Sequence, residues 1–261
     1  MHIKSLQNDR VKEVVKLRER RHRDRTGKFL IEGYRELLRA AESGLEIEEL
    51  FICPDLFLGE NENQLIKTLK AGVEITCDPA VFQKMSYRDR PDGLLAIAPQ
   101  MSRQLSDITF RSTPFVVVAE AIEKPGNLGT ILRTCDAVGA DALLVCDRCT
   151  DIHNPNVVRA SVGTLFTVPV IEVGNEEAAA WLESHGMSIL AATPAATELY
   201  TEIDLTQPTA IAFGTEQYGL SDFWLQRAQH RVRIPMKGHA DSLNVAMSTG
   251  VLLYEVLRQR A

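Results

Sequence analysis

The chain has 261 residues, of which 45% are hydrophobic and 25% are charged, and its formal net charge is -6. This composition is typical of a globular protein with two domains, and the negative charge argues against a non-specific nucleic-acid binder. No apolar run approaches the length of a membrane span, and the first residues contain no apolar signal core, so we expect neither membrane insertion nor export.

A basic stretch lies between residues 10 and 25. Val11, Val14 and Leu17 recur among its charged residues, so we expect a helix with one apolar and one basic face. The basic face is either an ordinary solvated surface or an arm that contacts RNA phosphates. The candidate phosphate ligands are Arg18, Arg20, Arg21, Arg23 and Arg25.

Short strands and helices alternate through the first hundred residues. The predicted strands cover residues 27–33, 50–53, 73–77 and 94–98. Such an alternation predicts a small α/β domain over residues 1–100. The polar, mixed stretch that follows predicts a linker at 101–113.

The second domain, residues 114–261, begins with a continuous apolar run at 115–119 that suits a strand buried on both faces. Further strands are predicted at 142–146, 166–173, 189–192, 210–213 and 232–234, with helical stretches between them. We therefore expect a mostly parallel sheet flanked by helices.

Three polar loops follow strands of this sheet, where open α/β sheets place their ligands. Asn127 and Arg133 follow the first strand, Glu216 lies between two glycines, and the third loop runs from Ile234 to Asn244. Each loop alone has a structural interpretation: a helix capped by Asn127, a tight glycine turn, or a helix capped by Ser242. Together they predict an active site.

Several other sites are not supported by the sequence. It contains neither the glycine fingerprint of dinucleotide-binding folds nor a P-loop. Cys146 and Cys149 form a lone C-x-x-C pair, which favours two reduced thiols over a zinc site. His239, Asp241 and Ser242 are too close in one loop for a hydrolase triad.

The three loops contain the patterns Asn127-x-Gly129-x-x-x-Arg133, Gly214-x-Glu216-x-x-Gly219 and Ile234-Pro235-Met236-x-Gly238-x-x-x-Ser242-Leu243-Asn244-Val245. In order and spacing they resemble the three motifs of the SpoU (TrmH) family of RNA ribose 2′-O-methyltransferases. Residues 154–163 resemble the segment between the first two motifs. The resemblance covers about residues 115–260, and residues 29–33 resemble part of the family's L30e-like substrate-binding domain. Ala246 departs from the family, which often has serine there.

This resemblance implies an α/β methyltransferase domain of the SPOUT type, with a C-terminal trefoil knot, that forms a homodimer through its C-terminal helices. It also implies S-adenosylmethionine as the cofactor and requires no metal. The implied cofactor-binding residues are Gly214, Ile234, Met236, Leu243 and Val245.

The implied catalytic residues are Arg133, Asn127, Glu216, Ser242 and Asn244. A guanidinium stays protonated in proteins, so Arg133 is better suited to hold a phosphate and to stabilise a developing alkoxide than to act as a base. The other residues would orient the ribose, relay its proton or hold Arg133.

The resemblance favours RNA contact by the basic stretch and an enzyme of the cytoplasm. A separate reader domain suits a structured target, and we expect 23S ribosomal RNA. The alternatives are a tRNA 2′-O-methyltransferase and a non-catalytic RNA-binding member of the fold. The sequence fixes neither the methylated nucleotide nor the choice between a housekeeping and an antibiotic-resistance role.

Overall fold

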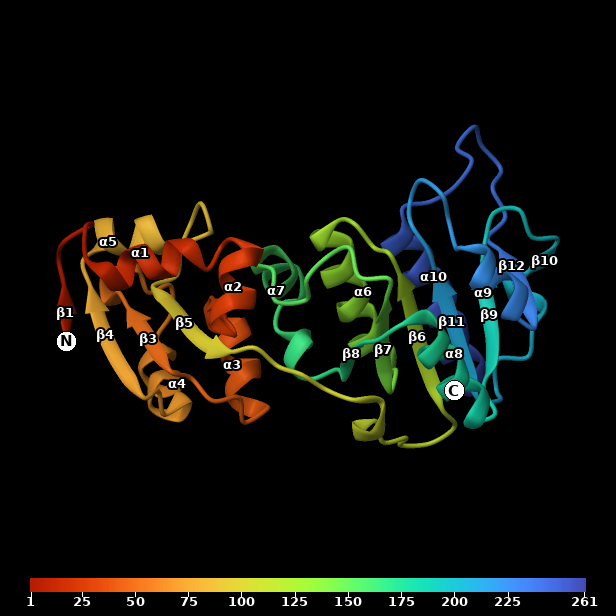
Figure 1. The fold of residues 1–261 in the computed structure, drawn as a ribbon, viewed down its shortest axis with the longest axis horizontal. Helices are drawn as coiled ribbons and strands as arrows, with labels where there is room; N and C mark the ends of the chain where they lie inside the picture. The colour runs from red at the N-terminus through yellow and green to blue at the C-terminus, as the bar shows by residue number, and fades with distance from the viewer. The chain divides into compact units, whose positions relative to one another are not determined.

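The computed structural model describes residues 1–261, which form two compact units (Figure 1). Unit 1 comprises Met1–Met101 and Asp151–Thr167, and unit 2 comprises Ser102–Thr150 and Val168–Ala261. The segment 151–167 was expected within the second domain, yet its contacts lie in unit 1. The ring of Phe29 packs against His153 and Phe166 there, with centroids 4.7 and 6.3 Å apart.

Unit 1 contains a five-stranded sheet in the order β1-β4-β3-β5-β2. The strands are β1 (His2–Ile3), β2 (Lys28–Glu32), β3 (Glu49–Ile52), β4 (Val73–Cys77) and β5 (Leu94–Pro99). β5 runs antiparallel to both neighbours, whereas β1, β4 and β3 are parallel. The expected small α/β domain is therefore present, with a mixed sheet.

Helices cover this sheet, and they bury the apolar residues that alternate along its strands. They are α1 (Asp9–Lys16), α2 (Arg20–Thr26), α3 (Tyr34–Glu42), α4 (Glu62–Leu69), α5 (Pro79–Met85) and α7 (Pro155–Ser161), with short 3-10 turns η1 (Pro54–Leu56) and η3 (Thr164–Phe166). One core joins α1 and α5 to the sheet through Val11, Val14, Phe82 and Met85.

The single basic helix expected over residues 10–25 is wrong, because the chain bends between α1 and α2. Leu17 ends α1 and is buried in the core, and Glu19 adopts extended backbone angles before α2 begins. The bend lets Arg18 donate to the carbonyls of Lys84, Met85 and Ser86 at the end of α5. These bonds satisfy acceptors that a helix end leaves open.

Unit 2 contains a seven-stranded, fully parallel sheet in the order β10-β12-β9-β11-β6-β7-β8. The strands are β6 (Phe115–Glu120), β7 (Ala142–Cys146), β8 (Val170–Glu172), β9 (Ser188–Ala192), β10 (Glu198–Leu199), β11 (Thr209–Phe213) and β12 (His230–Arg233). The expected parallel sheet is confirmed. The strand expected at 166–173 is shorter, because residues 164–166 form η3 in unit 1.

Helices lie on both faces of this sheet (Figure 1). α6 (Pro125–Val138) and α10 (Val245–Arg260) pack against each other, while α8 (Asn175–Ser184) and α9 (Asp222–Arg227) share a core with the sheet that contains the fully buried Trp224. The remaining 3-10 turns are η2 (Leu105–Asp107) and η4 (Tyr200–Glu202). No helix is both long and apolar enough to cross a bilayer.

Candidate active site

Three segments of unit 2 meet through the carboxylate of Glu216, which lies in the loop after β11. Glu216 accepts hydrogen bonds from Asn127, in the first turn of α6, and from Lys124 just before that helix. It also accepts one of 2.6 Å from the Nδ2 of Asn244, and the same Nδ2 lies 3.3 Å from the Oδ1 of Asn127. One residue of each predicted motif therefore takes part in a single cluster.

The local sequence explains how Asn127 and Asn244 reach this cluster. The Oδ1 of Asn244 caps α10 by accepting from the backbone N–H of Ala246 at 3.1 Å, which leaves its Nδ2 free for Glu216. Asn127 was expected to cap its helix, but Pro125 occupies the first helical position and Lys124 precedes it as the cap residue. Asn127 is thus the third residue of the helix, still within its first turn, and its side chain is available to the other loops. Ser242 precedes the cap residue of α10 rather than providing the cap.

The cluster keeps Glu216 ionised. Hydrogen bonding from Lys124 lowers the pKa of the Glu216 carboxyl, and the same contact raises the pKa of the Lys124 amine. The Glu216 side chain remains 29% exposed, and that of Lys124 69% exposed. An exposed ion pair contributes little to stability, so its main effect is to fix the position of a negative charge between α6 and α10.

A cavity of about 350 Å³ adjoins the cluster at the ends of β9, β11 and β12. Its lining includes the five predicted cofactor residues, Gly214, Ile234, Met236, Leu243 and Val245. The Thr215–Gly219 pair closes the β11 loop with two backbone hydrogen bonds of 3.0 Å. A side chain at Gly214 would overlap the carbonyl group of Gly219, so this turn requires a glycine.

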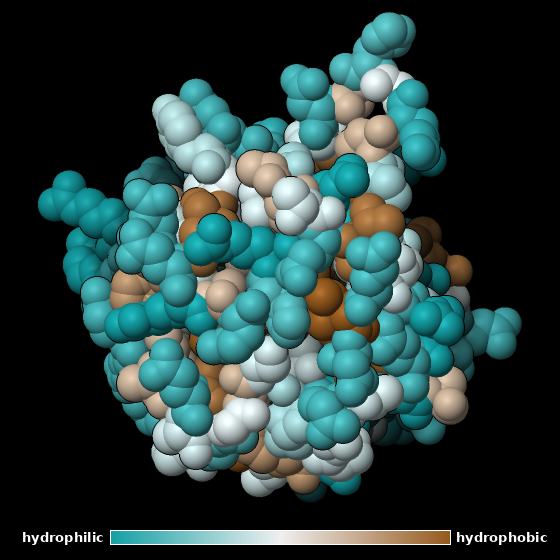
Figure 2. Space-filling model, turned by 90° about the vertical axis from the view of Figure 1, so that its right-hand side faces the viewer, coloured by the Kyte–Doolittle hydropathy of each residue, from teal (hydrophilic) through white to brown (hydrophobic).

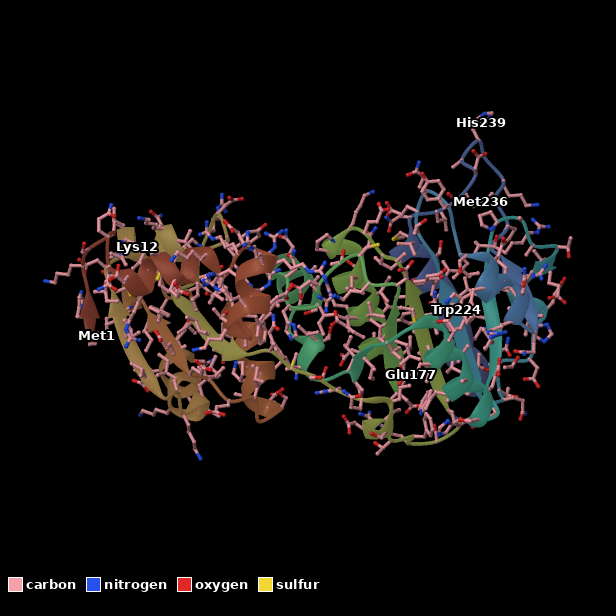
Figure 3. All side chains as sticks on the ribbon, in the orientation of Figure 1. Met1, Lys12, Glu177, Trp224, Met236 and His239 are labelled. Carbon is pink, nitrogen blue, oxygen red and sulfur yellow. The ribbon has the colours of Figure 1, made fainter.

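The third loop projects from unit 2. Figure 3 shows Met236 near the sheet and His239 at the outer end of the loop. In Figure 2, which keeps the vertical direction of Figure 1, the same loop is a mostly hydrophilic projection at the top. Ser242 and Asp241 line the cavity, whereas Lys237 and His239 are exposed outside it.

The structure does not bring Arg133 into the cluster. Arg133 lies on the exposed side of α6, beyond the turn that carries Asn127, and makes no hydrogen bond or ion pair. Ser242 is exposed at the cavity and makes no hydrogen bond with Glu216 or Asn244. Both side chains are free to meet a substrate. Lys124 was not among the predicted site residues, because only the folded structure brings it to Glu216, 92 residues away in the chain.

The basic stretch of unit 1 divides into structural and free arginines. Arg23 is 1% exposed and donates to Asp151 at 2.9 and 2.5 Å and to the carbonyls of Leu17 and Arg18. A guanidinium engaged in this way cannot reach RNA, so Arg23 leaves the candidate set. Arg18 is half-buried and caps α5.

Three arginines of α2 remain exposed. Arg20 lies 3.6 Å from Asp24, and the Arg25 guanidinium lies 2.8 Å from the Nδ1 of His22. Arg21 is exposed and makes no side-chain hydrogen bond or ion pair. These three side chains, with Arg21 foremost, are the arginines of the basic stretch that a phosphate backbone can reach.

The two cysteines of the C-x-x-C pair differ in their exposure to solvent. Cys146 is fully buried at the end of β7, and burial raises the pKa of its thiol to about 12, whereas Cys149 is exposed. No three His, Cys, Asp or Glu side chains are grouped so that they could hold a metal ion.

Comparisons with known proteins match both parts of the chain. A family model described as the SpoU rRNA methylase family matches residues 114–254, and a model of the MRM3-like substrate binding domain matches residues 8–96. The chain is 31% identical over 251 residues to the 23S rRNA (uridine(2479)-2′-O)-methyltransferase of Streptomyces viridochromogenes, covering 94% of this chain and 87% of that protein.

Solved structures give the same result. A crystal structure described as an RNA 2′-O ribose methyltransferase is 43% identical with a TM-score of 0.88, covering 100% of this chain and 99% of that chain. An AdoMet-bound rRNA methyltransferase from Sinorhizobium meliloti is 30% identical with a TM-score of 0.89, covering 99% and 97%.

Proposed function

The chain belongs to the SpoU rRNA methylase family, and we propose that it transfers a methyl group from S-adenosylmethionine to a ribose 2′-hydroxyl of 23S ribosomal RNA. The predicted family and the predicted α/β fold with a mostly parallel sheet are confirmed, and the protein is an RNA methyltransferase. The observation that carries the specific reaction is the Glu216 cluster beside the cavity, since it joins one residue of each motif.

The cavity fits the cofactor. Its volume lies within the range of roughly 300–1,000 Å³ of small-molecule sites. Met236, Leu243 and Val245 offer apolar contact, and the glycine turn at Gly214 lets backbone groups approach a ligand closely. S-adenosylmethionine supplies an electrophilic methyl group when bound, so the protein's task is to place the ribose and manage its proton.

The polar residues suit that task. Glu216 is ionised and holds the amide groups of Asn127 and Asn244 in fixed positions, from which they can orient a ribose hydroxyl. Arg133 keeps its charge and has no partner in the protein, so it is available to a phosphate next to the reacting ribose. Ser242 would contact the substrate from the cavity side.

Substitution of Arg133 tests this assignment. We expect Arg133→Ala to bind S-adenosylmethionine with unchanged affinity by calorimetry and to lose methyl transfer to ribosomal RNA. Arg227→Ala, on α9, is the matched control and should keep both properties. A rate near wild type for Arg133→Ala would remove Arg133 from the catalytic set.

The target RNA needs a separate experiment. Mapping of 2′-O-methyl sites in RNA from cells with and without the protein should show one site lost from 23S RNA, as the name of the Streptomyces relative suggests. Loss of a tRNA site instead would redirect the proposal to tRNA. Unchanged maps, with no S-adenosylmethionine binding by calorimetry, would indicate an RNA-binding protein without the chemistry.

An apolar stripe on α10 supports a homodimer through the C-terminal helix. Met247, Tyr254 and Leu257 are 61%, 53% and 40% exposed, and Leu243 before the helix is 39% exposed. Met247, Tyr254 and Leu257 recur at helical spacing, so they lie toward one side of α10, and a second copy of the chain would cover them. Sedimentation analysis should give a dimer, and Met247→Asp with Tyr254→Asp should give a monomer.

The remaining parts of the proposal concern organisation. We keep residues 1–100 as the RNA substrate-binding domain, 101–113 as the linker and 114–261 as the methyltransferase domain, in line with the two family matches. We also propose the trefoil knot of the SPOUT type for the C-terminal segment and the cytoplasm as the place where the protein acts. Arg20, Arg21 and Arg25 would contact RNA phosphates.

A further inference from the structure

The two oxygen atoms of the Glu216 carboxylate receive donors from different parts of unit 2. Oε1 accepts from the Nδ2 of Asn127 and, at 2.6 Å, from the Nδ2 of Asn244. Oε2 accepts from the Nζ of Lys124 and from no other donor. A carboxylate can accept at either oxygen, so the lysine determines which oxygen remains for the two amides and how the carboxylate is turned toward them.

The backbone that leads from β6 to Lys124 is held by contacts to β7 and the loop that follows it. Ala121 is buried and has a φ of 52°, a left-handed conformation that residues other than glycine rarely adopt. Its N–H donates to the carbonyl of Cys146 at 2.9 Å. The hydroxyl of Thr150, which is 5% exposed, donates to the carbonyl of Glu123 at 2.6 Å. Such a conformation persists where the surrounding structure determines it, so this segment is fixed up to the residue before Lys124.

The next residue, Pro125, restricts Lys124 from the other side. A residue before proline is limited to extended angles, and Lys124 has φ -88° and ψ 119°. The carbonyl of Lys124 also accepts from the backbone N–H groups of Asn127 and Leu128 at 3.0 and 3.2 Å, which joins it to the start of α6. The backbone of Lys124 is therefore fixed on both sides, and its side chain reaches from a fixed point to a residue 92 positions away in the chain.

We propose that Lys124 is a positioning residue for methyl transfer. By binding the Oε2 of Glu216, it keeps Oε1 turned toward Asn127 and Asn244, and these amides then meet the ribose in one orientation. The proposal rests on the function proposed above and adds to it a residue outside the three predicted motifs. Lys124 acts through Glu216 and does not contact the reacting atoms.

The charge of Lys124 acts in the same direction as this geometry. Its hydrogen bond and its positive charge lower the pKa of the Glu216 carboxyl. An ionised carboxylate has acceptors only, as the two amide donors require, whereas a protonated carboxyl presents an O–H to one of them. Methionine is unbranched but has neither the charge nor the N–H donors, so Lys124→Met removes both effects and keeps an apolar stem.

A lysine that is 69% exposed can also bind an RNA phosphate directly, and the two roles give different kinetics. A residue that orients the catalytic cluster changes kcat, because it acts within the bound complex. A residue that only binds the RNA backbone changes the KM for RNA and leaves kcat unchanged.

The kinetic test uses the full-length protein and 23S ribosomal RNA from cells that lack it. Lys124→Met should lower kcat about tenfold, with unchanged KM for RNA and unchanged affinity for S-adenosylmethionine by calorimetry. Lys124→Arg keeps the charge and the donors, so its kcat should return to within about threefold of wild type. Lys28→Met breaks an exposed lysine–carboxylate pair with Glu48 in unit 1 and is the matched control, with kinetics like wild type. A raised KM for RNA at unchanged kcat would assign Lys124 to a phosphate and overturn the proposal.

A double-mutant cycle tests whether Lys124 acts through Glu216. In the Glu216→Gln background, Lys124→Met should lower kcat by less than about twofold, because the carboxylate that it orients is already gone. A further loss as large as the one in the wild-type background would show that Lys124 acts on the substrate independently, and would overturn the proposal.

Crystal structures of wild type and Lys124→Met give a result that does not depend on activity. In the variant the Glu216 carboxylate should be rotated, with the Nδ2 of Asn244 more than about 3.5 Å from Oε1. Amide bonds to Oε1 that are unchanged in Lys124→Met would overturn the proposal. If the wild-type protein does not methylate RNA, the function proposed above is rejected, and the position of the carboxylate in the variant still decides whether Lys124 orients the cluster.

Discussion

The two units hold their carboxylates in opposite ways. In unit 2, Glu216 is partly exposed and receives donors from Lys124, Asn127 and Asn244, and its pKa is lowered. In unit 1, Glu36 is 4% exposed, and burial raises its pKa although it pairs with Arg88. The comparison distinguishes polar residues that organise a reaction from those that build a fold. Substitutions in the first group should change rates, and those in the second should change stability.

The largest expected effect is on the buried ion pair of unit 1. Arg23→Ala leaves Asp151, which is 4% exposed, without its charge partner, and such changes cost about 3–5 kcal/mol of unfolding free energy. Urea unfolding measures the loss. Arg21→Ala, in the same helix but exposed, should change stability by less than about 0.5 kcal/mol.

A double substitution serves as a further control for the buried Arg23–Asp151 ion pair. Replacing both partners, as in Arg23→Met with Asp151→Leu, removes the uncompensated charge and should recover part of the loss. Equal stability of Arg23→Ala and wild type would show that the pair does not hold unit 1 together. It would contradict the claim that the buried charged groups of unit 1 stabilise the fold.

Glu216→Gln is the corresponding change in unit 2. A neutral amide lacks the charge that fixes Lys124, and its NH2 group opposes the amide donors of Asn127 and Asn244. We expect kcat to fall by about 10²–10³, the size of losses seen when one preorganised polar group is removed, while the unfolding free energy stays within about 0.5 kcal/mol.

Single-turnover methylation and urea unfolding on the same variant check both halves of this prediction. Glu177→Gln, on the exposed surface of α8, is the matched control (Figure 3). A stability loss that accounts for the lower rate would place Glu216 among the structural carboxylates.

The sequence identified the unit 2 cluster because its residues belong to spaced motifs. Asn127, Glu216 and Asn244 follow parallel strands, and such strands deliver their loops to one edge of a sheet. Lys124 was not recognised because its partner is 92 residues away in the chain. Nothing in the local spacing of a lone lysine reports a contact of that range.

The basic stretch shows where prediction stops. Arg21 and Arg23 have the same side chain two positions apart, yet one is exposed and the other is buried against Asp151, which is 128 residues away. Composition gives the charge of a segment but not its tertiary partners. Similarly, the exposure of Met247, Tyr254 and Leu257 shows that part of the apolar face of α10 is not covered within this chain.

A change of pH should also distinguish the two kinds of carboxylate. Its effect on the free energy of unfolding should be smaller than that of Arg23→Ala. A carboxyl whose pKa is raised in the folded state stabilises the protein below its ordinary value of 4.5, and this stabilisation is lost as pH rises through the folded pKa. The free energy of unfolding of wild type should therefore fall, relative to that of Glu36→Gln, between pH 5 and pH 7, because glutamine does not titrate. Glu216 has a lowered pKa, so its contribution is present above 4.5 and is lost only below it.

The free energy of unfolding of wild type, relative to that of Glu216→Gln, should accordingly stay constant from pH 5 to pH 7. Urea unfolding of the three proteins across this range measures both differences. Parallel pH dependence for the two variants would contradict the opposite pKa directions on which the comparison rests.

The smallest effect concerns the free arginines. The Arg21 side chain is exposed and makes no hydrogen bond or ion pair within the protein, so Arg21→Gln should leave stability and S-adenosylmethionine binding unchanged. It should weaken RNA binding a few-fold for every sequence tested, and the slope of log affinity against log salt should fall by about 0.7–0.9 if one phosphate contact is lost. Lys67→Gln on α4 removes an equal charge elsewhere in unit 1 and should leave the slope unchanged. Equal slopes for Arg21→Gln and wild type would mean that this face of α2 is only a solvated surface, and the RNA would then have to be held by other residues of the protein.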